Sequence, residues 1–338
     1  MKIRMSLMLA TIFFCLSAIS GLAVAKDLIL VTGHDVLHVI DGDTDELIKE
    51  IPVEGFLREA IVSKDKKYVY TTNGRHTLHT VDIEQGKVVR SMQFDKDGWE
   101  RHIYGFKIDS QGKTGYFHFM PRKLENGQAH VASAVIAQAD LETGKILRSV
   151  DIPYGVMKIT LNEESGKIHA VGQDIYTIDI SGKGMTLTET YPMFDKGYNI
   201  LPAWDTQYEN GGVFLQNYYT ATSMGLVMID VETGKITDMP LPAEAFVFSY
   251  GYVLNSDKSK AYGSMDEVSA IDMKTGALLG YEVIQSGTKF CVNLSSDDKK
   301  VYVGGAGAFL DVFDAETLKL IKKIKLSTDG WDVRRMTL

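Results

Sequence analysis

Histidine is the residue type in this sequence whose positions most directly suggest a metal site. The eight histidines are scattered along the chain, and His76 and His79 stand three residues apart within one predicted strand. Side chains three positions apart on a strand point to opposite faces of the sheet, so this pair is poorly placed to share one metal ion. We therefore expect the histidines to pack or to face solvent, and we predict no metal site.

Aspartate is the second residue type with a regular placement, and either metal binding or turn formation would account for it. Seven aspartates each follow an apolar stretch: Asp41, Asp82, Asp140, Asp179, Asp230, Asp272 and Asp314. An Asp side chain can accept a hydrogen bond from a backbone N–H two residues on, and the Gly that often follows accepts the positive φ of a tight turn. We interpret the seven aspartates as turn residues.

Motifs for catalysis are missing from the sequence. It contains no CxxCH haem-attachment motif, no GxSxG elbow, no P-loop and no Rossmann fingerprint. The one grouping of reactive and aromatic residues is Trp99, Arg101 and His102, which falls short of the cluster of histidines and acids that a hydrolase or lyase would need. We identify no catalytic residue and do not expect this chain to catalyse a reaction alone.

The first 25 residues have the pattern of a secretory signal peptide. Lys2 and Arg4 precede an apolar run over residues 7–19, and the small residues 23–25 form a cleavage site before Lys26. A membrane anchor is the alternative, but the apolar run is short for a span of about 20 residues. We expect residues 1–25 to be removed and the rest to be a periplasmic protein without a membrane span.

Charge and cysteine content narrow the possible partners. The formal net charge of -8 becomes -10 when the two leader cations are removed, because the leader contains no Asp or Glu. Such an acidic chain is not expected to bind nucleic acid. Cys291 alone remains after cleavage, so no intramolecular disulfide can form and the chain has little means of holding a cofactor covalently.

Internal repetition organises the chain. Segments such as GLVMIDVETGKITDMP and EVSAIDMKTGALLGYE recur seven times, and the spacings between their aspartates are 41, 58, 39, 51, 42 and 42. A second element, such as LNSDKSKAYGSM or LSSDDKKVYVGG, precedes most copies and is typical of a strand, a polar turn and another strand. A period near 42 with four short strands per unit predicts a β-propeller.

The ends of the chain complete this architecture. The first repeat lacks its innermost strand, whereas the C-terminal segment STDGWDVRRMTL resembles the start of another repeat. We predict one domain over residues 26–338, an all-β propeller of seven blades with four antiparallel strands each, closed when the C-terminal strand joins the first blade. LPAWDTQ is expected to be the innermost strand of the fifth blade, YENGG its turn and VFLQNYY the next strand.

One face of the predicted propeller carries the long connections. Long loops on a rigid scaffold commonly bind partners, and aromatic and Arg residues are enriched at interfaces. A partner interface or cavity rim is therefore predicted at Trp99, Arg101, His102, Tyr198, Tyr218, Tyr219, Trp331 and Arg334. The alternative is that these aromatic residues only pack between blades.

Over residues 26–338, the sequence resembles the beta subunit of quinohemoprotein amine dehydrogenase. The likeness is carried by the repeats, by the insert after Phe119 and by LPAWDTQYENGGVF followed by NYYTA. The DxxTG turns are common to many propellers, so the insert and the LPAWDTQYE segment are the more specific signals. No motif of the family assigns catalytic residues to this chain.

The resemblance implies a subunit of a periplasmic complex that oxidises primary amines to aldehyde and ammonia. In that family the propeller binds no covalent cofactor and helps to wall the active-site cavity. A small gamma subunit carries cysteine tryptophylquinone, and an alpha subunit carries two c-type haems. The repeats alone are equally consistent with a different class of protein, a secreted propeller of the YVTN type that binds a protein or a ligand by itself.

Overall fold

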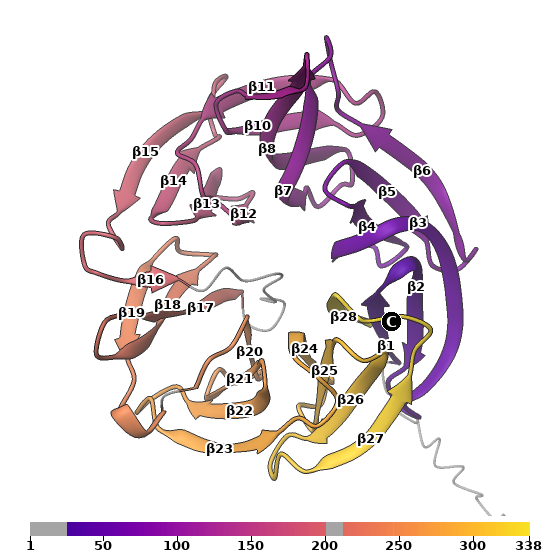
Figure 1. Ribbon diagram of the computed structural model, residues 1–338, viewed down its shortest axis with the longest axis vertical. Coiled ribbons are helices and arrows are strands. Elements are labelled where there is room, and N and C mark those ends of the chain that lie inside the picture. The colour runs from indigo at the N-terminus through magenta and orange to yellow at the C-terminus, as the bar shows by residue number, and fades with distance from the viewer. Residues whose placement is uncertain (1–25, 201–211, 246) are drawn as a thin grey trace, which may run out of the picture.

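The computed structural model describes residues 26–200, 212–245 and 247–338, and β-strands dominate them. The described residues form 28 strands and one 3₁₀ helix, η1 (Ala243–Ala245). The strands form sheets that stand around a central axis like the blades of a propeller (Figure 1). None of the helical segments described is long and apolar enough to cross a membrane. The predicted all-β class is confirmed, with the arrangement of a β-propeller.

The two ends of the chain meet in a seven-stranded sheet of order β28-β1-β2-β3-β4-β5-β6. Its strands are β1 (Asp27–Thr32), β2 (His34–Asp41), β3 (Glu46–Val62), β4 (Tyr68–Asn73), β5 (Thr77–Asp82), β6 (Lys87–Gln93) and β28 (Asp332–Thr337). The long strand β3 belongs to two four-stranded ladders, because its first part pairs mainly with β2 and its last part with β4. One ladder is β28-β1-β2-β3 and the other is β3-β4-β5-β6.

The rest of the chain forms five more antiparallel sheets in sequence order. A five-stranded sheet contains β7 (Glu100–Ile108), β8 (Thr114–Glu125), β10 (Val135–Asp140) and β11 (Ile146–Asp151), with β9 (Gln128–Val131) paired to β8. Two four-stranded sheets follow: β12 (Lys158–Asn162), β13 (Lys167–Val171), β14 (Ile175–Asp179) and β15 (Thr186–Tyr191), then β16 (Asn199–Ile200), β17 (Val213–Tyr219), β18 (Met224–Asp230) and β19 (Ile236–Pro240). The last two are β20 (Tyr252–Leu254), β21 (Lys260–Ser264), β22 (Glu267–Asp272) and β23 (Leu278–Val283), then β24 (Lys289–Leu294), β25 (Lys300–Gly305), β26 (Phe309–Asp314) and β27 (Leu320–Lys325).

The recurring aspartates make the turns that join the third and fourth strands. In all seven copies the Asp Oδ1 accepts a backbone N–H two or three residues on. Gly144 then takes a φ of 71°, and Leu318 takes a φ of 55° at the corresponding place in the last copy. The left-handed conformation favours Gly, so Leu318 is held there by the surrounding turn. The interpretation of these aspartates as turn residues is confirmed.

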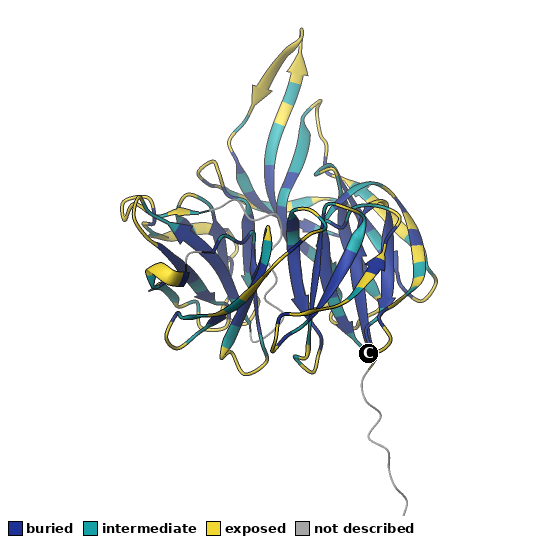
Figure 2. Cartoon of the chain, turned by 60° about the horizontal axis from the view of Figure 1, so that its bottom comes forward, coloured by how far each residue is buried: buried dark blue, intermediate teal, exposed yellow. Residues whose placement is uncertain are grey.

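The connections divide into two faces. The tight Asp turns lie on one side of the sheets, the turn face. The loops between second and third strands and between successive sheets lie on the other side, the loop face. Figure 2 shows the β8–β9 hairpin projecting from the loop face and the C-terminus at the turn face. The longest excursions therefore share one side of the molecule, as predicted from the alternation of strand direction.

Apolar side chains from adjacent sheets form the core. One cluster combines Val268 of β22 with Val292 of β24 and Phe313 of β26, each no more than 2% exposed. Burying a side chain of this size stabilises the fold by about 1.5–3 kcal/mol. Stability therefore comes mainly from contacts between one sheet and the next, which suits a protein whose described residues include a single cysteine, the buried Cys291.

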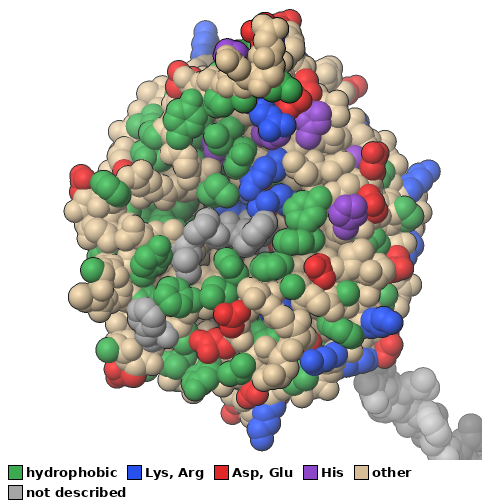
Figure 3. Space-filling model, viewed as in Figure 1, with side chains coloured by type: hydrophobic (Ala, Val, Ile, Leu, Met, Phe, Trp, Pro, Cys, Tyr) green, Lys and Arg blue, Asp and Glu red, His purple; other side chains and the backbone are tan. Residues whose placement is uncertain are grey.

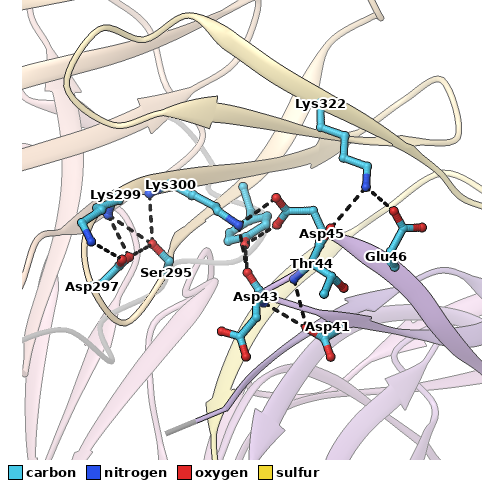
Figure 4. Close-up of polar contacts among 12 residues, drawn as sticks. Asp41, Asp43, Thr44, Asp45, Glu46, Ser295, Asp297, Lys299, Lys300 and Lys322 are labelled. Carbon is cyan, nitrogen blue, oxygen red and sulfur yellow. Dashed lines mark hydrogen bonds and ion pairs between the residues drawn. The ribbon is translucent and has the colours of Figure 1, made fainter. Parts of the chain in front are cut away.

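Strand β28 joins the C-terminus to the first strand of the chain. It pairs antiparallel with β1 over six residues, from Asp27 opposite Thr337 to Thr32 opposite Asp332. Nearby, Lys300 Nζ lies 2.7 Å from Asp45 Oδ2, and Lys322 pairs with Glu46 (Figure 4). The two ion pairs link the last sheet to the ladder built from the first residues. They add to the backbone pairing of β28 with β1.

The segment around the fifth repeat is described in part. The predicted strand VFLQNYY is confirmed as β17, which pairs with β18. Residues 201–211 lie outside the described residues, and with them all of LPAWDTQ and all of YENGG except Gly212. Strand β16, which comprises Asn199 and Ile200, pairs with β17.

Candidate docking surface on the loop face

Aromatic side chains form a continuous arc on the loop face near the axis. Trp331 stacks on Phe290 with ring centroids 4.9 Å apart, and it meets the Phe56 ring edge-on with centroids 4.4 Å apart. Phe290 continues the arc to Tyr250 at 5.9 Å. We call these four residues the aromatic arc. Each ring is partly exposed, so the arc offers apolar surface on the side of the longest loops.

A second aromatic pair lies further around the same face. Tyr219, at the end of β17, meets Phe248 edge-on with centroids 6.3 Å apart, and both are partly exposed. Figure 3 shows hydrophobic side chains spread around the centre of this face, with Lys and Arg side chains gathered beside the axis. Aromatic and Arg residues are the types enriched at protein interfaces. The loop face therefore has the composition of a docking surface.

Two of the cations near the axis contact aromatic rings. The Arg58 guanidinium lies 6.0 Å from the centre of the Phe56 ring, and the Arg75 guanidinium lies 4.0 Å from that of Tyr104. Cation–π contacts of this kind hold long side chains in one direction. Both aromatic residues belong to innermost strands, so these contacts fix basic groups at the inner edge of the loop face.

Trp99, Arg101 and His102 lie together at the corner between β6 and β7. Trp99 closes a tight turn with Lys96 through two backbone hydrogen bonds. The Arg101 guanidinium donates to the Phe94 carbonyl. His102 Nε2 lies 3.1 Å from Glu100 Oε2, which also accepts from Arg122. All three side chains are partly exposed; Arg101 and His102 are engaged by neighbouring groups of the chain, and Trp99 is the aromatic surface at this corner of the loop face.

Tyr198, Tyr218 and Tyr219 have different surroundings. Tyr198 and Tyr218 stack with ring centroids 3.8 Å apart, and the Tyr198 hydroxyl donates to Asp238 Oδ2 at 2.9 Å. Tyr218 is only 2% exposed, and burial, aided by Tyr198, raises the pKa of its hydroxyl. Alternation along the strand predicts that one of Tyr218 and Tyr219 turns inward and the other outward, and the structure agrees: Tyr218 is the buried one and stabilises the sheet, whereas Tyr219 offers surface on the loop face.

Trp331 and Arg334 are also separated, although both belong to the C-terminal segment. Trp331 lies at the centre of the aromatic arc. Arg334 is 3% exposed, and its Nε donates to Asp332 Oδ2 at 2.7 Å. Arg334 thus lies inside the molecule at the axis and contributes nothing to the rim of the loop face.

A cavity of about 340 Å³ lies beside Tyr219, between the sheets of β13 and β17. Met157, Val171 and Phe214 give it apolar walls, and Lys158 and Gln216 supply polar groups. A volume just above 300 Å³ is at the small end of the range for ligand pockets. A small ligand is therefore a second possible occupant of the loop-face region.

The run Asp41-Gly42-Asp43-Thr44-Asp45 has the alternating aspartates of a calcium loop. In the structure, Asp41 accepts backbone N–H groups and pairs with Lys26 at 2.8 Å, whereas Asp45 pairs with Lys300 (Figure 4). The two carboxylates are therefore held apart by different cations. Over residues 26–200, 212–245 and 247–338, no three His, Cys, Asp or Glu side chains are placed to hold a metal ion.

Phe56, Phe290, Tyr250 and Phe248 belong to this surface but were not predicted from the sequence. Phe56 directly precedes the part of β3 that pairs with β4, and Trp331 directly precedes β28. Phe290 is the second residue of β24. An aromatic residue near the start of the innermost strand is therefore a recurring signal in the repeats. It could have been found by aligning these strands as well as the Asp turns.

Comparison with known proteins supports the fold. No family model matches the chain, and no curated protein matches it in sequence. A protein of unknown function from Desulfotomaculum acetoxidans superposes with a TM-score of 0.66 at 13% identity, covering 92% of this chain and 99% of the other. AztD from Citrobacter koseri gives 0.57 at 15% identity, with 93% and 98% covered, and hydrazine synthase from Kuenenia stuttgartiensis gives 0.58 at 16%, with 87% and 90% covered. Similarities at such identities show the propeller fold alone.

Proposed function

We propose that this chain is the non-catalytic propeller subunit of a periplasmic quinohemoprotein amine dehydrogenase, an oxidoreductase that converts primary amines to aldehyde and ammonia. The aromatic arc is the observation that carries the proposal, because it places Phe56, Trp331, Phe290 and Tyr250 side by side on the face with the longest loops. The identity of the complex is proposed from the resemblance of the repeats, of the insert after Phe119 and of the LPAWDTQYE segment to the beta subunit of that enzyme.

The proposed architecture is a closed ring of seven blades. Counting β3 in both of its ladders, the strands group into seven units of four, with β9 as an addition to the third. The pairing of β28 with β1 would then close the ring and leave no free sheet edge at the chain ends. A closed, rigid ring is suited to hold smaller subunits in fixed positions.

The proposed division of labour leaves the redox chemistry to the partners. Cysteine tryptophylquinone would belong to a small gamma subunit and the c-type haems to a di-haem alpha subunit. Cys291 is buried at 1% exposure inside the last sheet and stands outside any CxxCH motif, which is consistent with a chain that attaches no cofactor. The role of this chain would be to dock the gamma subunit and to wall the amine cavity with Trp99, Tyr219 and the aromatic arc.

The second candidate is a stand-alone secreted propeller that binds a ligand or a protein. The cavity of about 340 Å³ beside Tyr219 favours it, since such a cavity needs no partner subunit to be useful. The two candidates differ in what accompanies the protein in the periplasm.

Affinity capture from the periplasm of the native host distinguishes them. The tagged chain is expected to recover a haem protein and a small quinone protein, seen as c-type haem and quinone absorbance. Trp331→Ala and Phe290→Ala should each weaken capture by roughly 30-fold or more, as for aromatic anchors worth about 2 kcal/mol. Tyr281→Ala is the matched control, because Tyr281 is 57% exposed on the outer strand β23.

Recovery of the chain as a lone monomer without haem or quinone absorbance would refute the amine dehydrogenase assignment. Equal weakening by Tyr281→Ala would refute the assignment of docking to the aromatic arc, since that residue lies on the outer edge of a sheet.

A further inference from the structure

A second cavity lies on the axis, toward the turn face. It has a volume of about 230 Å³ and is lined by residues of the innermost strands: Ala60, Ile61 and Val62 of β3, Lys107 and Ile108 of β7, Leu161 of β12 and Arg334 of β28, with Glu163 of the β12–β13 turn. We call it the axial pocket. It is separate in position from the aromatic arc, which occupies the loop face.

The two cations of the axial pocket are buried and held in place. Lys107 is 8% exposed and Arg334 is 3% exposed. Lys107 Nζ lies 3.8 Å from Glu59 Oε1, and the Arg334 Nε donates to Asp332, whose carboxylate also accepts the Ala60 N–H at 2.8 Å. Buried cations are rare and costly unless charged groups or ligands surround them. Their preorganised heads are suited to meet an anion without further ordering.

More positive charge lies around the same point of the axis. Burial would raise the pKa of the Glu59 carboxyl, but Lys158, Lys107, Arg334 and Arg58 together hold it below its ordinary value. Four cations from β3, β7, β12 and β28 are thus close enough to act on one carboxylate. This gathering stands out in a chain whose formal net charge is -8. The four cations outnumber the buried carboxylates of Glu59 and Asp332 that pair with them, so the excess charge there is positive and favours a negative ligand.

The remaining walls determine what kind of anion would fit. The one acid among the lining residues, Glu163, accepts hydrogen bonds from the backbone N–H and the hydroxyl of Ser110, at 2.7 and 3.1 Å, so its carboxylate is engaged at the turn. Ile61, Val62 and Leu161 supply apolar surface. The volume is below the range of about 300–1,000 Å³ for drug-sized ligands. Charge, apolar walls and size together match a short-chain carboxylate better than a bulky or purely inorganic anion.

We propose that the axial pocket binds a short-chain carboxylate, whose carboxylate meets Lys107 and Arg334 and whose alkyl chain contacts Ile61, Val62 and Leu161. The site lies apart from the docking surface proposed for the loop face, because it is built from the turn-face halves of the innermost strands. Its occupancy can be tested on the purified chain without any partner subunit.

Isothermal titration calorimetry at constant ionic strength tests the proposal with butyrate as the probe. Butyrate is expected to bind, whereas butyramide, which has the same shape and no charge, is expected to bind at least tenfold more weakly. Lys107→Gln should weaken butyrate binding at least tenfold. The control is Lys183→Gln, which removes the same charge from an exposed turn and should leave the affinity unchanged.

A second variant, which keeps every charge, tests whether a loss of butyrate binding comes from the pocket itself and not from misfolding. Leu161→Phe should reduce butyrate binding at least tenfold by filling the pocket, with an unchanged far-ultraviolet circular dichroism spectrum. Binding of butyramide as tight as that of butyrate would overturn the proposal, as would undetectable butyrate binding or an equal loss in Lys183→Gln. Wild-type affinity in a folded Leu161→Phe variant would also overturn it, since the ligand would then lie elsewhere.

Discussion

Replacing Tyr302 with Phe should weaken the junction between the last sheet and the first residues of the chain. The Tyr302 side chain is fully buried, and its hydroxyl donates to Asp45 Oδ1 at 2.8 Å and lies 3.1 Å from the Gly42 carbonyl. Burial and the neighbouring Asp45 carboxylate raise the pKa of the Tyr302 hydroxyl, so it is a neutral donor at working pH. Tyr302→Phe removes this donor and leaves the shape of the ring.

The neighbouring repeat contains a matched control. Tyr262 is 2% exposed, and its hydroxyl donates to the Ala315 carbonyl at 2.9 Å, across the boundary between the last two sheets. Tyr262→Phe therefore removes a hydrogen bond to a neutral acceptor, worth about 0.5–1.5 kcal/mol. Tyr302→Phe removes one to a carboxylate that is 6% exposed, worth about 1.5–3 kcal/mol. We expect Tyr302→Phe to be the more damaging by about 1 kcal/mol.

Urea denaturation followed by tryptophan fluorescence measures this difference. Both variants should lower the midpoint of unfolding with an unchanged slope, and Tyr302→Phe should lower it further. A loss in Tyr302→Phe equal to or smaller than that in Tyr262→Phe would refute the reasoning, because it would mean that the junction of the chain ends contributes no more than an ordinary boundary between sheets.

Three further predictions concern the terminal strand, the two tyrosines of β17 and a buried histidine. Deleting residues 331–338 should abolish cooperative unfolding, and an unchanged melting transition would contradict the role of β28. Tyr218→Ala should cost about 3–5 kcal/mol in urea unfolding because it empties a buried site, whereas Tyr219→Ala should reduce partner capture at a nearly unchanged midpoint; the reverse pattern would be inconsistent with their burial. Burial, aided by Arg75, lowers the pKa of His118 to about 3. Between about pH 3 and pH 6.5 the unfolded chain therefore binds a proton that the folded chain does not. The free energy of unfolding should fall as the pH drops through this range, by up to about 1.4 kcal/mol per pH unit. His118→Leu should flatten that slope between urea midpoints at pH 7 and pH 5, and an unchanged slope would contradict the assignment.

The repeat architecture could be predicted because its determinants are local. Each Asp turn is fixed by a carboxylate and N–H groups within three residues, as for Asp272 with Lys274 and Thr275. The same local chemistry is repeated along the chain, so the repeat period and the order of the strands could be predicted from the sequence alone. The order of strands then fixed which connections share the loop face.

The docking surface could be predicted only in part, because its members come from distant repeats. Phe56 and Trp331 are 275 residues apart in the sequence and have ring centroids 4.4 Å apart in the fold. Alternation along β17 predicts that one of Tyr218 and Tyr219 turns inward, but not which one, because neighbouring sheets cover both faces of a central strand in a propeller. Of the basic groups at the axis, Arg334 is among the residues predicted from the sequence, whereas Arg58, Lys107 and Lys158 were missed because each innermost strand contributes only one or two of them.

Strand β28 connects the candidate surface and the axial pocket in one short element. Trp331 precedes it on the loop face, and Arg334 within it lines the axial pocket. Its backbone pairing is to β1 alone among the strands of the sheet, so the six-residue register with β1 sets the position of both side chains. A ligand that binds Arg334 only in the folded protein would stabilise this pairing by mass action, and with it the position of Trp331 in the aromatic arc. Both sites therefore depend on the register of β28 with β1, although they lie on opposite faces.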